Sequence, residues 1–237
     1  MAVDRNGIKS LCASVKKTNR NILFPAEAES VLRIYGIKVI KSISCRNNLD
    51  EILQAAEEIG CPVALKLISL DILHKSDFGC VCLNLKNRDE IVKAYDKVLR
   101  NIDQRIPRAG IEGFLIQGMA SEGHEAIIGL AEDPTFGKVI MFGLGGIFVE
   151  ILKDVAFRKI PINSIDAWDM IEEIKGFKIL QGARGKEPAN LNLLQEILMQ
   201  TSFLGQEIDE IKEIDLNPVF VNSQNALVAD PRIILHA

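Results

Sequence analysis

A lysine in an apolar run is the first residue of this chain with the chemistry to handle phosphate. Lys66 lies inside the sequence VALKLIS at residues 63–69. Burying an ammonium group among apolar neighbours is expensive without a partner. A phosphate is one such partner, because an ammonium is a compact point charge for phosphoryl oxygens. A lysine on an edge strand that reaches solvent explains the pattern equally well, so this segment alone favours neither interpretation.

A polar segment, DILHKSDFGC at residues 71–80, follows this run directly. A loop of this kind can present backbone N–H groups to phosphates, and Gly79 closes it just before the next predicted strand. His74 is its only strong neutral nucleophile near pH 7. An ordinary exposed loop histidine is the alternative interpretation.

Oxygen-bearing side chains near the C-terminus suggest a metal site. Asp215 and Asn217 are two residues apart in EIDLNP, and on a strand they share one face. Asp230, in ADPR, is expected on the hairpin partner of that strand. Such oxygens suit Mg²⁺, which takes one or two protein oxygens together with phosphate oxygens and water. A turn rich in Asn, Asp and Pro is the alternative, and the repetition of acidic groups across the hairpin favours the metal.

The segment MFGLGGIFVE, residues 141–150, holds three glycines in four positions. It superficially resembles a dinucleotide-binding fingerprint, but it lacks the third glycine and no long helix follows, which excludes that motif. The glycines still predict an unusual backbone path or a close approach to a ligand. The charged residues that follow are typical of a solvated face.

Composition excludes several classes of protein. The net charge of -4 gives no basic footprint for nucleic acid, and the apolar runs are far shorter than the roughly 20 residues of a membrane helix. The five cysteines contain no C-x-x-C pair and the three histidines are scattered, which argues against a zinc site. Reduced thiols in a cytoplasmic protein are expected.

Apolar periodicity and end signals give the elements that must position these residues. Gly36, Asn48 and Gly60 are the clearest caps. The order is strand, helix, two strands, helix, strand, and then a strand-rich half with two helices, which excludes regular βα alternation. Helices are predicted at 25–35, 49–59, 88–102, 164–174 and 191–203, and strands at 37–43, 63–69, 81–85, 111–117, 124–131, 138–142, 211–221 and 226–229.

Taken together, these segments resemble the ATP-grasp beta subunit of the ADP-forming acetate–CoA ligase family. The resemblance runs from about residue 21 to the C-terminus. It implies an α+β, ATP-grasp fold at 21–237, with two α+β lobes at about 21–117 and 118–237 enclosing a nucleotide. Residues 1–20 fall outside it and are expected to form a flexible extension or a strap on a partner. The matching motifs are PVALK, DILHKSD with Gly79, DP-x-FG, residues 141–150, L-x-G-x-RG and D-x-NPV.

The family resemblance implies the reaction acyl-CoA + ADP + phosphate ⇌ carboxylate + CoA + ATP. It also implies a separate CoA-binding alpha subunit, or a fused domain, that forms a phosphohistidine, and an alpha2beta2 assembly is expected. By resemblance, His74 carries the phosphoryl group, and Asp215 steadies His74 once that histidine is phosphorylated. The same resemblance implies that Lys66 and Gly79 bind the phosphates and that Gln117 and Glu125 bind the nucleoside. It also implies that Asn217 and Asp230 bind Mg²⁺.

Two positions depart from the family pattern. Cys80 replaces the second glycine of a Gly-Gly pair, which is expected either to stiffen the phosphate loop or to expose a thiol beside the nucleotide. Gly118 stands where an acid usually follows Gln117. The alternatives are therefore another ATP-grasp ligase, such as a succinate-type CoA ligase subunit, or a regulatory subunit without catalysis. The DILHKSD loop argues against ligases that use an acyl phosphate directly.

Overall fold

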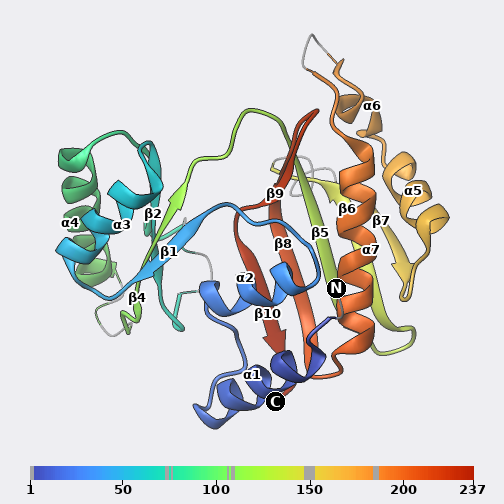
Figure 1. The fold of residues 1–237 in the computed structure, drawn as a ribbon, viewed down its shortest axis with the longest axis horizontal. Coiled ribbons are helices and arrows are strands. Elements are labelled where there is room, and N and C mark those ends of the chain that lie inside the picture. Colours follow the sequence, from blue (N-terminus) through green and yellow to red (C-terminus); the bar gives the residue numbers. More distant parts are fainter. Residues whose placement is uncertain are drawn as a thin grey trace. The chain divides into compact units, whose positions relative to one another are not determined.

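The computed structural model describes residues 3–72, 75, 77–105, 107, 110–146, 153–183 and 187–237. These residues fall into two compact units (Figure 1). The larger unit consists of Met1–Val39 and Ala120–Ala237, and the smaller unit is Ile40–Met119. Each unit builds its own antiparallel sheet and its own apolar core, which agrees with the predicted α+β class.

The smaller unit is a four-stranded sheet in the order β1-β4-β2-β3, with two helices packed on one face (Figure 1). Its core joins the helices to the strands through residues such as Ile52, Val98, Leu65 and Phe114. The elements are β1 (Ser42–Cys45), α3 (Leu49–Ile59), β2 (Val63–Ile68), β3 (Val81–Leu85), α4 (Arg88–Arg105) and β4 (Gly113–Gly118).

Helix α3 shows why the local sequence forms these elements. The Asn48 side chain accepts a hydrogen bond from the Glu51 N–H at 3.1 Å, which satisfies one of the free donors of the first turn. Gly60 ends the helix with φ +89°, a conformation that glycine adopts without strain. Between them, Ile52, Leu53, Ala55 and Ala56 form the buried face. The predicted helix at 49–59 is confirmed.

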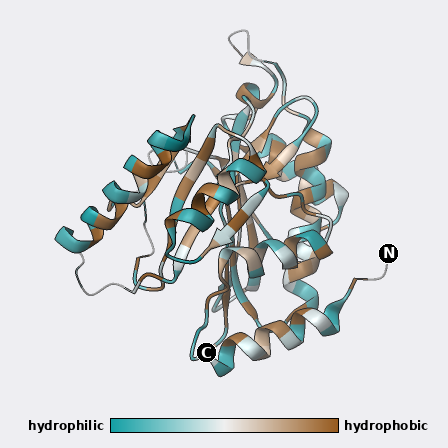
Figure 2. Cartoon of the chain, turned by 60° about the vertical axis from the view of Figure 1, so that its left-hand side comes forward, coloured by the Kyte–Doolittle hydropathy of each residue, from teal (hydrophilic) through white to brown (hydrophobic). Residues whose placement is uncertain are grey.

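The larger unit is a six-stranded sheet in the order β10-β8-β5-β6-β7, with β9 pairing with β8. Helices cover one of its faces, and their apolar sides turn toward the strands (Figure 2). Its elements are α1 (Arg5–Lys17), α2 (Pro25–Ile34), β5 (His124–Asp133), β6 (Gly137–Leu144), β7 (Val155–Lys159), α5 (Ser164–Glu173), α6 (Phe177–Leu180), α7 (Leu191–Glu207), β8 (Ile211–Val221), β9 (Ala226–Val228) and β10 (Pro231–Leu235).

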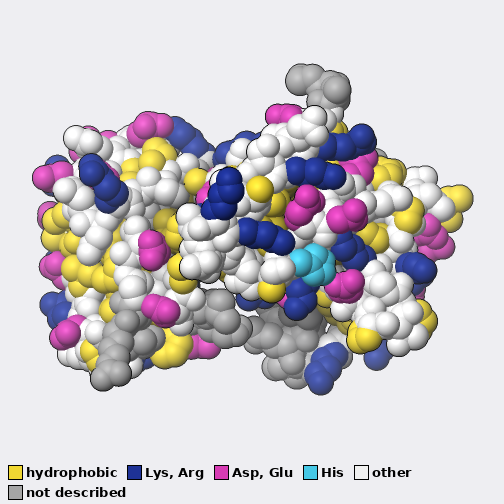
Figure 3. Space-filling model, turned by 90° about the horizontal axis from the view of Figure 1, so that it is seen from below, with side chains coloured by type: hydrophobic (Ala, Val, Ile, Leu, Met, Phe, Trp, Pro, Cys, Tyr) yellow, Lys and Arg dark blue, Asp and Glu magenta, His cyan; other side chains and the backbone are white. Residues whose placement is uncertain are grey.

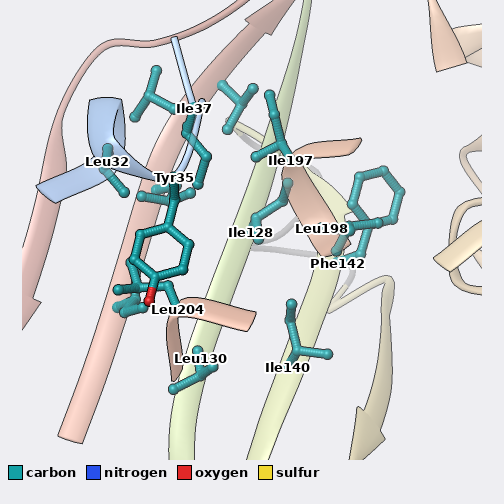
Figure 4. Packing of buried hydrophobic residues seen from close by; sticks show 14 of the residues in the cluster. Leu32, Tyr35, Ile37, Ile128, Leu130, Ile140, Phe142, Ile197, Leu198 and Leu204 are labelled. Carbon is teal, nitrogen blue, oxygen red and sulfur yellow. The ribbon is translucent and has the colours of Figure 1, made fainter. Parts of the chain in front are cut away.

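The core of the larger unit lies between this sheet and helices α2 and α7 (Figure 4). Side chains from the two helices and the turn after α2 meet Ile128 and Leu130 on β5 and Ile140 and Phe142 on β6. Strand residues alternate between the two faces of a sheet. On β8, Ile214 and Leu216 therefore enter this core, and the intervening Asp215 turns to the opposite face.

The first 20 residues contradict the prediction of a flexible extension. Arg5–Lys17 form helix α1, whose Asp4 side chain accepts from the Gly7 N–H at 2.9 Å. Ile8, Cys12 and Val15 lie at most 1% exposed in the core of the larger unit. Their spacing of four and three residues places them on one side of a helix. The sequence itself contains this amphipathic pattern.

The division of the chain also differs from the predicted lobes at about 21–117 and 118–237. The segment up to Val39 belongs to the larger unit, because Val39 forms a bridge with Val228 and the Lys38 carbonyl accepts from the Val228 N–H. The predicted strand at 37–43 is consequently shorter and later, at Ser42–Cys45. Sequence periodicity also missed β7, α6 and β10.

None of the helices formed by the described residues combines the length and apolarity needed to cross a bilayer. On the side seen in Figure 3, acidic and basic side chains of the described residues are interspersed.

Candidate functional site

The predicted site residues are distributed over both units. Lys66, Gly79 and Gln117 belong to the smaller unit, and Glu125, Asp215, Asn217 and Asp230 belong to the larger one. His74 lies outside the described residues, so its predicted role rests on the sequence. The geometry of each group is therefore given within its own unit.

Strands β8 and β10 place two of the predicted metal ligands opposite each other. Pro231 pairs with Leu216, and the Ala229 N–H donates to the Pro218 carbonyl at 3.0 Å. Asp230, between these two points, therefore lies across from Asn217. The predicted hairpin partner at 226–229 is only the start of the return, because β10 continues the pairing beyond Asp230.

This arrangement suits Mg²⁺ by its donor chemistry. An amide oxygen and a carboxylate oxygen supply the one or two protein ligands that Mg²⁺ takes when phosphate and water complete its shell. Asn217 is exposed and Asp230 is partly exposed, so both remain open to a nucleotide. The described residues hold no cluster of three or more His, Cys, Asp and Glu that would form an all-protein metal cage.

Asp215 lies beside this pair within a small charged cluster. Arg232, opposite it on β10, brings its Nη2 within 3.5 Å of the Asp215 Oδ2 and donates to the Glu213 Oε1 at 3.0 Å. Burial raises the pKa of Asp215 above its ordinary value. The Arg232 guanidinium opposes that shift, and the Glu213 and Asp230 carboxylates add to it.

The glycine-rich segment runs past Glu125 at close range. The Gly145 N–H donates to the Glu125 carbonyl at 2.8 Å, and a Cβ on Gly145 would meet the Glu125 Cβ at 3.0 Å. Gly146 has φ +63°, which favours glycine. The predicted unusual backbone path is thus found at Gly146, and it leaves the Glu125 side chain exposed.

Glu125 also lines a cleft of about 730 Å³ in the larger unit. Polar and apolar surface line it in about equal parts, and sequence reasoning identified only Glu125, because the fold brings Glu187, Phe220 and Asn222 to it from other segments. The lining residues are Ala120, Ser121, Glu122, Gly123, His124, Glu125, Glu187, Phe220 and Asn222.

Hydrogen bonds between those segments hold the cleft wall together. The buried His124 donates from Nε2 to the Glu187 carbonyl at 2.8 Å, which places a ring proton on that nitrogen. Asn222 donates to the Ser121 hydroxyl at 3.0 Å, and the Ser223 hydroxyl donates to the Glu187 carboxylate at 2.9 Å. Polar groups in such a wall can accept hydrogen bonds from the hydroxyls of a bound molecule.

Lys66 occupies an interior strand rather than an edge. It pairs with Leu115 on β4 and with Val81 on β3, which rules out the edge-strand interpretation. Gln117 pairs with Ala64, two residues before Lys66, so Lys66 and Gln117 lie on the same face of the sheet. The core residues Leu65 and Ile116 alternate with them, so this face is opposite α3 and α4.

Gly79 and Cys80 are tied to the core side of the smaller unit. Gly79 has φ +64°, and its carbonyl accepts from the Asn101 side chain at 2.9 Å. Cys80 is fully buried in the apolar core, and burial raises the pKa of its thiol. The expectation of a thiol exposed beside the nucleotide is therefore wrong, because the small apolar side chain fills core space at the start of β3.

Comparison with known proteins gives this geometry a family context. The family described as "ATP-grasp domain" matches residues 14–235. The Pyrococcus furiosus acetate–CoA ligase [ADP-forming] II subunit beta is 51% identical over 219 residues, which span 91% of this chain and 92% of that protein.

Solved structures of one synthetase are closely similar. In the Ca. Korarchaeum cryptofilum dinucleotide-forming acetyl-coenzyme A synthetase 1 with coenzyme A and Ca-AMPCP, the matched chain has a TM-score of 0.93 and 41% identity, covering 96% of this chain and 99% of that one. The same synthetase with coenzyme A and Mg-AMPPCP has its phosphohistidine segment pointing towards the nucleotide-binding site. It gives a TM-score of 0.83 and 40% identity, covering 97% of this chain and 100% of that one.

Proposed function

The chain belongs to the ATP-grasp family as a beta subunit of the ADP-forming acetate–CoA ligase type, and from this membership we propose that it makes ATP by passing a phosphoryl group through His74 to ADP. The overall reaction is acyl-CoA + ADP + phosphate ⇌ carboxylate + CoA + ATP. The observation that carries the proposal is a family match along almost the whole chain that includes the DILHKSD loop.

The proposed relay consists of two displacements at phosphorus, and in each of them one bond forms as another breaks. A ring nitrogen of His74 attacks phosphorus on the partner's phosphohistidine, so one N–P bond forms as the partner's breaks. A β-phosphate oxygen of ADP then attacks the phosphorus on His74, and the second N–P bond breaks as ATP forms. Neutral imidazole is nucleophilic near pH 7, and phosphoryl transfer mainly requires positioning and charge neutralisation.

We propose nucleotide-binding residues in each unit. Glu125, in the cleft of the larger unit, is the candidate for accepting hydrogen bonds from nucleoside hydroxyls. Gln117 and Lys66 share the face of their sheet opposite α3 and α4. We assign Gln117 to the base, and Lys66 with Gly79 to the phosphates, because an ammonium group neutralises phosphoryl oxygens.

Asn217 and Asp230 are proposed to hold Mg²⁺, which when bound neutralises charge on the phosphoryl oxygens. Asp215 is proposed to orient His74 after its phosphorylation, as a carboxylate orients an imidazole at other sites. The close placement of these three residues on β8 and at the start of β10 supports this assignment.

A CoA-binding alpha subunit is the proposed partner, in an alpha2beta2 assembly. Its phosphohistidine would supply the phosphoryl group that His74 takes. The five free cysteines suit a reducing compartment, and we propose the cytoplasm.

The decisive test concerns His74. The wild-type alpha subunit is mixed with wild-type chain or with His74→Ala, and acyl-CoA, ADP and labelled phosphate are added. We expect label on the alpha subunit in both mixtures, and labelled ATP only with the wild-type chain. Near-normal labelled ATP from the variant would show direct transfer from the alpha subunit to ADP and would refute the relay.

A further inference from the structure

Arg232, on β10 of the β8–β10 pair, has no role in the reaction proposed above. Ile234 pairs with Glu213 and Arg232 pairs with Asp215, while Ile214 and Ile233 beside them enter the core. By alternation, Glu213, Asp215 and Arg232 therefore share the face opposite the helices.

Arg232 contacts both carboxylates of β8 through one nitrogen. Its Nη2 is 3.0 Å from the Glu213 Oε1 and 3.5 Å from the Asp215 Oδ2. All three side chains are about one third exposed, so the pair energies are modest. The consequence is mainly geometric, because the hydrogen bond to Glu213 holds the guanidinium in place and its charge draws the Asp215 carboxylate toward it.

The charges around Asp215 add to this geometric effect. Glu213, Asp215 and Asp230 place three carboxylates on neighbouring positions of two paired strands, and Arg232 forms ion pairs with two of them. Without it, mutual repulsion would push the Asp215 carboxylate away from Glu213. Arg232 therefore restricts where that carboxylate can point.

We propose that Arg232 is a positioning residue for phosphoryl transfer, which holds the Asp215 carboxylate in the orientation needed to steady phosphorylated His74. This inference rests on the proposed function. Arg232 acts through Asp215 and not on the nucleotide or Mg²⁺. An arginine that only braces two strands would instead affect folding and every activity together.

The test is a double-mutant cycle in the complete enzyme, this chain with its alpha subunit. Arg232→Gln should lower kcat for acyl-CoA-dependent ATP synthesis by about 10- to 100-fold, as loss of an orienting partner does at other sites. Its KM for Mg·ADP should stay the same or fall, because removing a cation beside Asn217 and Asp230 favours Mg²⁺. Arg232→Lys, which keeps the charge, should recover part of kcat.

The energetic coupling between substitutions at Arg232 and Asp215 then distinguishes a positioning role of Arg232 from a role in holding the two strands together. If Arg232 acts through Asp215, Arg232→Gln combined with Asp215→Asn should be no slower than Asp215→Asn alone. Arg158→Gln is the matched control, since Arg158 has similar exposure on the same sheet and pairs with Glu173 at 2.6 Å. It should leave kcat unchanged.

Additive losses in the double variant, an unchanged kcat in Arg232→Gln, or a KM for Mg·ADP that rises in step with the loss of kcat would overturn the inference. Failure of the proposed function has a different signature. In that case His74→Ala stays active, whatever the coupling between Arg232 and Asp215.

Discussion

At the scale of single residues, the candidate site depends on pairs that sequence spacing could only suggest. Asp215 and Asn217 were expected on one strand face, and β8 provides that face. Asp230 lies across from Asn217 only because the chain returns through β9 and then continues as β10. The proximity of amide and carboxylate oxygens is what makes Mg²⁺ a specific expectation for these two positions.

Removing either proposed Mg²⁺ ligand should weaken nucleotide binding. Asn217→Ala and Asp230→Ala are each expected to raise the Kd for Mg·ADP by about tenfold or more, which corresponds to about 1.4 kcal/mol. Calorimetry with and without EDTA measures this change in Kd. Without Mg²⁺, both variants should bind ADP as the wild type does.

Asn225→Ala is the control for this experiment, because Asn225 is an exposed residue of the turn between β8 and β9. It should bind Mg·ADP normally. Unchanged Mg²⁺ dependence in both ligand variants would remove the metal assignment from Asn217 and Asp230.

At the scale of elements, local signals and long-range packing contribute differently. Caps and apolar spacing predicted α3, and β3 was predicted at the same residues, since each has strong end signals within the segment itself. Strand β7 was missed because its sequence VAFRK is short and charged, and it forms by pairing with β6. Helix α1 differs from the expected flexible extension because its apolar face packs into the core of the larger unit.

The buried face of α1 provides a stability test. Ile8→Ala should lower the free energy of unfolding by about 2–5 kcal/mol, the usual cost of truncating a large buried aliphatic side chain. Urea unfolding followed by circular dichroism measures the change.

Lys9→Ala, at the exposed position next to Ile8, should change stability by less than about 0.5 kcal/mol. Equal stabilities of Ile8→Ala and the wild type would mean that α1 is not packed in solution and would favour the alternative expectation, a strap on a partner.

At the scale of the whole molecule, two units with separate cores share the proposed nucleotide residues. Lys66 and Gln117 come from the smaller unit, and Glu125 with the β8–β10 residues from the larger one. In each unit these residues lie on the sheet face opposite the core that the unit's own helices cover. A fold of this kind can bind and position a nucleotide, while the acyl-CoA chemistry is assigned to the alpha subunit.

This division of labour predicts dependence on the partner. The isolated chain should bind ADP or ATP with Mg²⁺ but make no acyl-CoA from acetate, CoA and ATP. Adding the alpha subunit should restore synthesis up to an equimolar ratio, and light scattering of the mixture should give the mass of an alpha2beta2 assembly. Robust synthesis by this chain alone would contradict the two-component proposal.

The sequence by itself determined the features that depend on neighbouring residues: the capped helices, most strands, the α+β class and the order of motifs that identified the family. Chemistry-bearing types at fixed spacing, such as Asp215 with Asn217, were also visible, because strand alternation is a local rule. Only the tertiary structure decided which distant segments meet. Arg232 contacts Glu213 and Asp215, Cys80 enters the core, and α1 joins the larger unit, because strand register and packing are set by interactions across the whole chain.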